Sequence, residues 1–367
     1  MDRALRLARR GLGRTAPNPV VGCVLVQDGQ VVGEGFHPKA GAGHAEVFAL
    51  REAGSRARGA TAYVTLEPCS HYGRTPPCVD ALIQAGVVEV VAAMGDPDER
   101  VAGRGFERLK EAGIVVRVGV RQAESVALNR PFVSRILRGR PLLTVKMAAS
   151  MDGKTATQTG QSQWITGVAA RVSVGRLRDT HDVIMVGIGT VLADDPKLNC
   201  RIVGGRDPIR LVVDSQLRIP DAAQVWSSSV AAPLWLATVG AGGERAQYLQ
   251  RRGAKIIACR DDGVGRVDLN DLLKQLGDLG INSVLSEAGA VLTGALMRSG
   301  LVDRLALYLA PMLIGGVGAP GLLGNMGVDD LKEAPRLHGA EISRVGSDFL
   351  LTASLGDWMR DEACLPV

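Results

Sequence analysis

Four side chains in the first quarter of the chain, at His44, Glu46, Cys69 and Cys78, are of the types that bind and use a zinc ion. One imidazole and two thiolates leave the fourth tetrahedral position of Zn²⁺ open to water, as catalytic sites do. Glu46 follows His44 by two residues, and side chains so spaced do not share a face of a regular helix. We therefore expect the metal at the first turn of a helix, with Glu46 free to carry protons.

The order of these residues is that of the zinc deaminases, in which a His-x-Glu motif precedes a Pro-Cys-x-x-Cys motif. Pro68 and Cys69 match the second motif, but eight residues separate the two cysteines here. The longer loop, CSHYGRTPPC, carries His71 and Arg74. The alternative is a structural zinc site closed by a fourth ligand, for which the nearby candidates are His37, His71 and Cys23.

The loop between the cysteines resembles that of the bifunctional pyrimidine deaminase/reductases of riboflavin biosynthesis. The resemblance continues upstream in TAPNPVVGCVLVQDGQVVGEGFHPKAGAGHAE and downstream in KMAASMDGKTAT, SQWIT, VGIGTVLADDPKLNCR, VVDSQ and SEAGAVLTGAL, so it covers nearly the whole chain. It implies an N-terminal cytidine-deaminase-like three-layer α/β/α domain and a C-terminal dihydrofolate-reductase-like α/β domain. It also implies Zn²⁺ and NADPH as cofactors.

Length and composition agree with two α/β domains. A chain of 367 residues can form about two cores, and 46% hydrophobic residues with few aromatics favours α/β layers. The composition changes at Gly139-Arg140-Pro141, after a helical pattern over 121–138, so we place a deaminase domain at 1–139 and a reductase domain at 140–367. Between the helical segments of the second domain, strand-length apolar runs occur at DVIMVG, IRLVVD, APLWLAT, AKIIAC, NSVLSE and RLALYLAP.

Local signals place further elements in the first domain. MDRALRLARRGLGR is typical of an amphipathic first helix and lacks the features of a signal peptide. Asp28-Gly29 predicts a hairpin turn between two β-rich runs. ATAYVTLEPC predicts a strand that delivers Cys69, and PPCVDALIQAG predicts a helix that carries Cys78 in its first turn.

The stretch 286–295, SEAGAVLTGA, predicts a strand that ends in a small-residue turn and opens a helix. Unpaired amides at that helix start, without a Cβ at Gly289, would hold a phosphate. The resemblance implies NADPH contacts at Ala148, Trp164, Thr190, Asp194, Ser215, Gly289, Ala290, Val291, Leu292, Thr293, Gly294 and Ala295. It implies contacts to the substrate of the reductase at Ser162, Arg178, Leu198, Arg201 and Glu287.

Several of these positions have other interpretations. Arg178 and Arg201 could clamp a phosphate or be solvated surface arginines. The sequence Asp194-Asp195-Pro196 is also typical of a turn, and Trp164 could belong to the core. A G-x-G-x-x-G motif beginning at Gly316 is followed by Pro320 and more glycines instead of a helix, so we interpret it as a loop.

The deaminase implied by the resemblance replaces a ring amino group by an oxo group on a diaminopyrimidinone that bears a phosphoribosylamino group. Glu46 would move the protons. The reductase half would then convert the ribosyl group to a ribityl chain. Candidates for recognising the base and the phosphate in the first domain are Asn18, His37, His71 and Arg74, although Asn18, between two prolines, could equally be a turn residue.

Charge and hydropathy limit the partners. The net charge of +5 is scattered and not interleaved with aromatics, which argues against nucleic acid. The uncharged stretch 305–328 is broken by prolines and glycines, so we expect a strand and a buried loop there and no membrane span. Widely spaced cysteines favour a reducing compartment, and we expect a cytoplasmic homo-oligomer acting on a small phosphorylated pyrimidine. The rival functions are a nucleic-acid-editing deaminase, a deaminase with a non-catalytic second domain, and a non-enzymatic binding protein with a zinc core.

Overall fold

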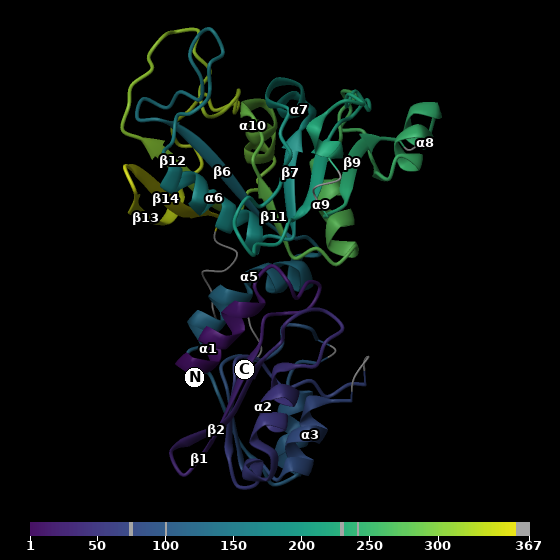
Figure 1. Ribbon diagram of the computed structural model, residues 1–367, viewed down its shortest axis with the longest axis vertical. Coiled ribbons are helices and arrows are strands. Elements are labelled where there is room, and N and C mark those ends of the chain that lie inside the picture. The colour runs from purple at the N-terminus through teal and green to yellow at the C-terminus, as the bar shows by residue number, and fades with distance from the viewer. Residues whose placement is uncertain (73–75, 100, 228–230, 241, 357–367) are drawn as a thin grey trace. The chain divides into compact units, whose positions relative to one another are not determined.

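The computed structural model describes residues 1–72, 76–99, 101–227, 231–240 and 242–356. These residues form two compact units, 1–139 and 140–356, each built around its own sheet (Figure 1). Among the helices of these residues, none is long and apolar enough to cross a membrane. Each unit is described by itself below.

The first unit alternates helices and strands. In chain order its elements are α1 (Asp2–Ala8), β1 (Gly22–Gln27), β2 (Gln30–Phe36), α2 (Ala45–Ala53), β3 (Thr61–Val64), α3 (Cys78–Ala85), β4 (Glu89–Ala92), α4 (Arg104–Glu111), β5 (Val115–Val118) and α5 (Gln122–Arg138). The strand order is β2-β1-β3-β4-β5, with β1 antiparallel to both neighbours and the remaining pairs parallel. The predicted first helix, the hairpin at Asp28-Gly29 and the helix over 121–138 are confirmed.

Both faces of this first sheet are covered, because successive side chains of a strand point to opposite faces. On β1, Cys23 and Leu25 pack into a core shared with α2, α3 and α4. Val24, between them, packs against α1 on the other face. A Cβ on Gly33 of β2 would collide with the backbone of α2, so glycine permits that helix to lie close to the sheet. The unit is a three-layer α/β/α sandwich, as predicted.

The second unit has a nine-stranded sheet. In chain order its elements are β6 (Leu142–Ser150), α6 (Val168–Thr180), β7 (Val183–Gly187), α7 (Ile188–Asp194), β8 (Ile209–Val213), β9 (Leu234–Val239), α8 (Glu244–Arg251), β10 (Lys255–Cys259), α9 (Leu269–Asp278), β11 (Ser283–Ser286), α10 (Ala290–Arg298), β12 (Arg304–Ala310), β13 (Leu337–Val345) and β14 (Asp348–Leu355). The strand order is β10-β9-β8-β7-β11-β6-β12-β14-β13.

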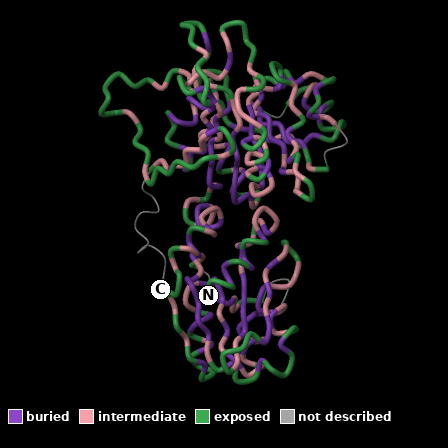
Figure 2. Tube along the Cα trace, turned by 60° about the vertical axis from the view of Figure 1, so that its left-hand side comes forward, coloured by how far each residue is buried: buried purple, intermediate pink, exposed green. Residues whose placement is uncertain are grey.

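Seven neighbouring strands of this sheet, from β10 to β12, run parallel, and β14 and β13 add an antiparallel hairpin at one edge. One face packs Val145 and Met185 against leucines of α9 and α10. The other packs Val186 and Val212 against α7 and α8. The strands of both units are the most deeply buried part of the chain (Figure 2). The carboxyl ends of the parallel strands meet at one edge, where binding sites of α/β sheets form.

Two features of the second unit differ from the sequence prediction. The hairpin of β13 and β14 has no counterpart among the predicted strands; most residues of β13 are exposed, and its sequence, LHGAEISRV, has no continuous apolar run. The prediction of a buried loop after β12 is wrong. Residues 311–336 are mostly exposed, and the Val317 side chain is fully exposed. A glycine-rich segment has few side chains to bury, so connecting segments of this kind run over the surface.

Candidate active sites

Three elements bring the predicted metal ligands together in the first unit. His44 is the residue immediately before α2, Cys69 lies in the loop after β3, and Cys78 is the first residue of α3. Two helix starts therefore converge on the same point, and the positive ends of their dipoles favour anionic ligands there. The backbone amide of Cys78 donates to Sγ of Cys69 over 3.3 Å, which fixes the second sulfur against the start of α3.

The donor atoms have the spacing of a zinc site. Nδ1 of His44 lies 3.2 Å from Sγ of Cys78 and 3.5 Å from Sγ of Cys69. Tetrahedral zinc, with bonds of about 2.0–2.3 Å, places its ligand atoms roughly 3.3–3.8 Å apart. The three atoms lie within 4.8 Å of one another, so the residues fit the ion with little movement.

The sulfurs of Cys69 and Cys78 differ in their pKa values. A hydrogen bond from the Cys78 thiol, aided by His44 and opposed by burial, lowers the pKa of Cys69 to about 4. The pKa of Cys78 is raised, because it donates that hydrogen bond and is buried. The Cys69 thiol therefore loses its proton more readily than the Cys78 thiol, and metal binding requires that both sulfurs be deprotonated.

Glu46 lies in the first turn of α2, beside the metal ligands but not among them. Only 3% of the residue is exposed, and its Oε2 has no hydrogen-bond partner among the described residues. Burial, reinforced by the negative charge on Cys69, raises the pKa of Glu46 to about 7. A carboxyl group with this pKa can accept and release a proton near neutral pH.

No fourth protein ligand closes the site among the described residues. His37 is buried and held by Asn18 and by the Gly43 carbonyl, each 3.0 Å from a ring nitrogen. Cys23 is buried in the sheet core, and His71 is exposed. The alternative of a closed structural site is therefore not supported by the geometry.

A cavity of about 490 Å³ opens onto these groups. Asn18, His37 and His71, which the sequence singled out for substrate recognition, all line it together with His44 and Glu46. The Asn18 amide reaches Nε2 of His37, while its backbone amide closes a turn onto the Thr15 carbonyl, so Asn18 is both a turn residue and a cavity residue. Arg74 lies outside the described residues.

Sequence reasoning missed the acidic wall of this cavity. Asp96 lines it, and burial raises the pKa of Asp96 to about 6. Glu67, which precedes the Pro-Cys pair, accepts backbone amides from Asp96, Gly103 and Gly105 at 2.8 to 3.2 Å. Glu67 therefore fixes the loop that carries Asp96. The only sequence signal was the Asp-x-Asp pair after the strand VVEVVAAM.

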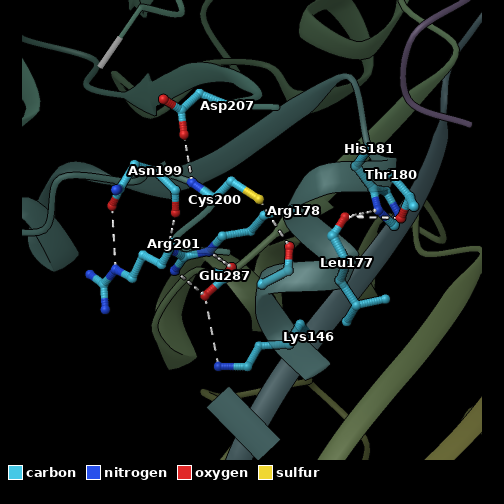
Figure 3. A network of polar contacts seen from close by, with 11 residues as sticks. Lys146, Leu177, Arg178, Thr180, His181, Asn199, Cys200, Arg201, Asp207 and Glu287 are labelled. Atoms are coloured by element: carbon cyan, nitrogen blue, oxygen red, sulfur yellow. Dashed lines mark hydrogen bonds and ion pairs between the residues drawn. The ribbon is translucent and has the colours of Figure 1, made fainter. Parts of the chain in front are cut away.

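The central feature of the second unit is a polar network around Glu287 (Figure 3). Arg178 on α6 donates to both carboxylate oxygens of Glu287 and, over 2.7 Å, to the Asn199 carbonyl. Lys146 on β6 approaches the same carboxylate, with Nζ 3.7 Å from Oε2. Burial opposes the charge on Glu287, but Arg178 and Lys146 outweigh it and lower the pKa of Glu287 to about 2. Glu287 is therefore negatively charged and holds two cationic side chains, Arg178 and Lys146, beside it.

A cavity of about 630 Å³ lies over this network. It brings together predicted residues of both groups: Arg178, Leu198, Arg201 and Glu287 from the substrate group, and Trp164, Thr190 and Asp194 from the cofactor group. Lys146 was not predicted, although it is the only charged residue in the strand LLTVKMAAS. Asn199, also missed, links the two arginines, since its Oδ1 accepts from Arg201 over 3.3 Å.

The loop that supplies part of this cavity has an unusual backbone. Asp195, Leu198 and Arg201 all have positive φ angles, of 42°, 56° and 65°. For non-glycine residues such conformations cost of order 1 kcal/mol each and cluster at binding sites. Asp194 ends α7 and Asp195 follows in the left-handed conformation, so the predicted turn and the predicted cavity residue coexist. Trp164 is not a core residue, because 61% of it is exposed and Arg171 stacks on its ring at 4.6 Å.

A larger cavity of about 1000 Å³ adjoins α7 and α10. Its lining includes these residues of the predicted cofactor set: Thr190, Asp194, Ser215, Gly289, Ala290, Val291, Leu292 and Ala295. Gly289 precedes α10 without a side-chain cap, so the amides of the first turn are available to an anion. Thr190 and Asp194 line both this cavity and the smaller one.

Four predicted residues do not line either cavity of the second unit. Thr293 is fully buried, and its hydroxyl donates to the Ala288 carbonyl over 3.2 Å. Gly294 packs against the Gly324 backbone. Ser162 is half-buried beside the cavity residues 163 and 164. Ala148 lies two residues after Lys146 on β6 and so faces the same side of the sheet.

Comparison with known proteins matches each unit to a family. Residues 1–94 match the cytidine and deoxycytidylate deaminase zinc-binding region, and residues 141–351 match the RibD C-terminal domain. The predicted α/β fold classes of both halves are thereby confirmed.

Whole-chain relatives contain both regions. The chain is 46% identical to the riboflavin biosynthesis protein RibD of Escherichia coli K12, over 96% of this chain and 97% of that protein. It superposes on Acinetobacter baumannii RibD with a TM-score of 0.88 and 40% identity, covering 97% of both chains. A Thermotoga maritima protein described as a diaminohydroxyphosphoribosylaminopyrimidine deaminase and 5-amino-6-(5-phosphoribosylamino)uracil reductase gives a TM-score of 0.86 at 33% identity, with 97% of both chains covered.

Proposed function

We propose which residues carry out the two reactions of this chain, which belongs to the RibD family and is therefore a bifunctional deaminase and reductase of riboflavin biosynthesis that uses zinc and NADPH. Residues 1–139 deaminate 2,5-diamino-6-(5-phosphoribosylamino)pyrimidin-4(3H)-one. Residues 140–367 then reduce the ribosyl group of the product to a ribityl chain. The observation that carries the first assignment is the convergence of His44, Cys69 and Cys78 beside the buried Glu46, whose Oε2 has no hydrogen-bond partner among the described residues.

In the deamination, His44, Cys69 and Cys78 hold the zinc ion. When bound, zinc acts as a Lewis acid that makes hydroxide available near neutral pH. Glu46 takes a proton from the attacking water, delivers it to the ring nitrogen next to the reacting carbon, and transfers a second proton to the departing amine. Water is consumed, ammonia leaves, and an amino group becomes an oxo group. The pKa of about 7 for Glu46 matches both directions of transfer.

Substrate recognition in the first cavity falls to polar residues on its wall. Asn18 and His37, held together at 3.0 Å, form the part of the cavity wall that the pyrimidine edge would contact. His71, an exposed residue between the two cysteines, would meet the phosphate, and so would Arg74, which lies outside the described residues. The cavity volume of about 490 Å³ is within the range of small-molecule sites.

In the reduction, NADPH, when bound, supplies the hydride to C1 of the ring-opened ribosylamine. Arg178 and Glu287 fix the cavity wall, and Arg201 pairs with the substrate phosphate, with Ser162 and Leu198 completing that wall. Lys146 carries the proton for the imine nitrogen, because its ammonium group lies 3.7 Å from the Glu287 carboxylate in the same cavity.

The cofactor occupies the larger cavity. Residues 289–292 and Ala295, at the start of α10, face its diphosphate, while Thr190, Asp194 and Ser215 line the remainder. Trp164 and Ala148 border the nicotinamide end. Thr293 and Gly294 support this turn on the side away from the cavity, since both pack into the protein.

The assembly and location of the protein are further parts of the proposal. We expect a homo-oligomer, supported by the edge strand β13, on which the Ile342 side chain is 71% exposed. A long exposed strand edge tends to pair with another chain. We also place the enzyme in the cytoplasm, where its cysteines, free among the described residues, would stay reduced.

Mass spectrometry of the products tests the assignment. With zinc-loaded protein and the diaminopyrimidine phosphate, we expect amino-to-oxo exchange without NADPH, followed by a gain of two hydrogens when NADPH is added. Exchange that stops there despite NADPH would leave a deaminase with a non-catalytic second domain. A nucleic-acid-editing deaminase, which the whole-chain match disfavours, would instead act on single-stranded RNA or DNA and leave this substrate unchanged.

A further inference from the structure

NADPH differs from NADH only by a phosphate on the 2′ oxygen of the adenosine ribose, so an enzyme that prefers NADPH needs groups that contact that phosphate. We propose that Arg218 and Arg266 bind the 2′-phosphate and set the preference for NADPH over NADH. This inference rests on the proposed placement of the cofactor in the cavity beside α10. Both arginines line that cavity.

The cavity has two chemically distinct parts. One is the start of α10, where an uncapped helix terminus and Gly289 offer backbone amides. The other is formed by two loops that each follow a strand, residues 215–218 after β8 and residues 261–267 after β10. A volume of about 1000 Å³ is at the upper end for small-molecule sites and suits an extended dinucleotide.

The two loops are fastened to each other. The backbone amide of Val267 donates to Oγ of Ser215 over 3.1 Å. The second loop is a narrow hairpin, closed by a bridge between Asp261 and Val267. Arg266 is next to Val267 in sequence, and Arg218 is three residues beyond Ser215. The two connected loops therefore place both arginines along the wall of the same cavity.

Among the described residues, the carboxylates make no ion pair shorter than 4.0 Å with Arg218 or Arg266. Asp261 accepts two hairpin amides at 2.6 and 2.9 Å, and Asp262 accepts two more at 3.0 and 3.1 Å. Arg218 forms a long ion pair with the buried Asp214, 4.0 Å from Nε to Oδ1, and 57% of the Arg218 side chain is exposed. Within the described part of the chain, the Arg266 guanidinium has no hydrogen-bond or ion-pair partner. Both cations thus retain donors for a ligand.

The same arrangement disfavours recognition of NADH. Sites that select NADH place a free carboxylate on the ribose 2′-hydroxyl. Here Oδ1 of Asp261 and Oδ1 of Asp262 each accept two amides of their own hairpin, which ties both carboxylates to the hairpin backbone. Two arginines facing a dianionic group form the charge-assisted hydrogen bonds for which guanidinium is suited.

Equilibrium binding tests the inference without turnover. NADPH and NADH are titrated into the full-length protein and followed by nicotinamide fluorescence, and 2′,5′-ADP and 5′-AMP are titrated by calorimetry. We expect Arg218→Ala and Arg266→Ala each to weaken NADPH and 2′,5′-ADP about tenfold, the step that one charge-assisted hydrogen bond represents. Affinity for NADH and 5′-AMP should change by less than about twofold.

Arg298→Ala is the matched control. Arg298 lines the same cavity, but it lies at the end of α10 and its guanidinium donates to the Asn325 carbonyl. This variant should leave the ratio of NADPH to NADH affinity unchanged. Unaltered thermal melting of all three variants would show that they are folded.

The possible outcomes distinguish a failure of the 2′-phosphate assignment from a failure of the proposed reductase site. Equal loss of NADPH and NADH affinity in the Arg218 and Arg266 variants, or no loss in either, would overturn the 2′-phosphate assignment while leaving the cofactor cavity intact. A selective loss that appears only in the Arg298 variant would also overturn it. If the unsubstituted protein binds neither NADPH nor 2′,5′-ADP, the proposed reductase site itself fails.

Discussion

Arg178 and Glu287, 109 residues apart in sequence, form a two-point ion pair in which Nε lies 2.6 Å from Oε1 and the second contact measures 2.9 Å. Each side chain is only 10% exposed. The pair joins α6 to the turn between β11 and α10, which borders both cavities of the second unit. One interaction therefore supports the substrate wall and the cofactor turn together.

Glu287→Gln should damage the second unit selectively. It leaves the buried Arg178 charge without its partner, and breaking a buried pair in this way costs about 3–5 kcal/mol. We expect a lower melting temperature, loss of reduction and unchanged deamination, measured by calorimetry and by product analysis. Arg260→Ala, which removes an exposed pair with Asp271 at 3.2 Å, is the control and should cost less than about 1 kcal/mol. Equal effects of the two substitutions would contradict the special role of the buried pair.

Glu46→Gln should abolish deamination without loss of the metal. Removing a general acid and base lowers kcat by about 10² to 10⁴, whereas the three zinc ligands remain. Zinc content by atomic absorption and reduction of the deaminated intermediate should match the unsubstituted protein. Glu52→Gln changes a carboxylate on the same helix whose Oε2 accepts the Glu34 amide, and it should retain turnover. Loss of zinc from the Glu46 variant would show that this residue is a ligand.

The metal centre could be predicted from sequence because each of its parts is local. His44 and Glu46 lie within three residues, the Pro77-Cys78 step begins a helix, and the helix start explains how side chains two residues apart converge. The parallel strands of the second unit were also evident, since parallel strands covered on both faces are continuous apolar runs.

The network in the second unit could not be predicted in the same way. Lys146, Arg178 and Glu287 lie on three elements that meet only through sheet order, β11 being inserted between β7 and β6. A single lysine in a strand or an arginine in a helix carries no signal of its partner. Asp96 was not predicted for a related reason. Its burial depends on the loop over residues 96–105, which is fixed by three backbone amides that donate to Glu67.

Removal of zinc should separate the two activities. Chelation should stop deamination and destabilise the first unit, because His44, Cys69 and Cys78 come from three segments that the ion would join. NADPH binding and reduction of the deaminated intermediate should persist, since the cavities of the second unit contain none of these ligands. Activity assays after chelation and after return of zinc provide the measurement. Loss of both activities on chelation, with both restored by zinc, would argue against separate sites.

His181 should make the stability of the second unit depend on pH. Its ring bridges the Leu177 carbonyl, 2.7 Å away, and the Thr144 hydroxyl, 3.1 Å away. Burial, aided by the charge of Arg304, lowers the pKa of His181 to about 4. The unfolded chain titrates near the ordinary value of about 6.5 and so binds more protons than the folded chain below that pH. Stability should therefore be level above about pH 6.5 and fall as the pH drops towards 4, by about 2–3 kcal/mol.

Denaturant titrations followed by tryptophan fluorescence measure this, because three of the four tryptophans, Trp164, Trp226 and Trp235, lie in the second unit. His181→Gln removes the titrating ring and should flatten the slope between pH 6.5 and 4, even if its absolute stability is lower. Glu287 contributes in a separate window, because a pKa lowered to about 2 supports stability above its ordinary value, and that support is lost only as the pH falls from about 4.5 towards 2. An unchanged slope in the His181 variant would assign the pH dependence to other groups.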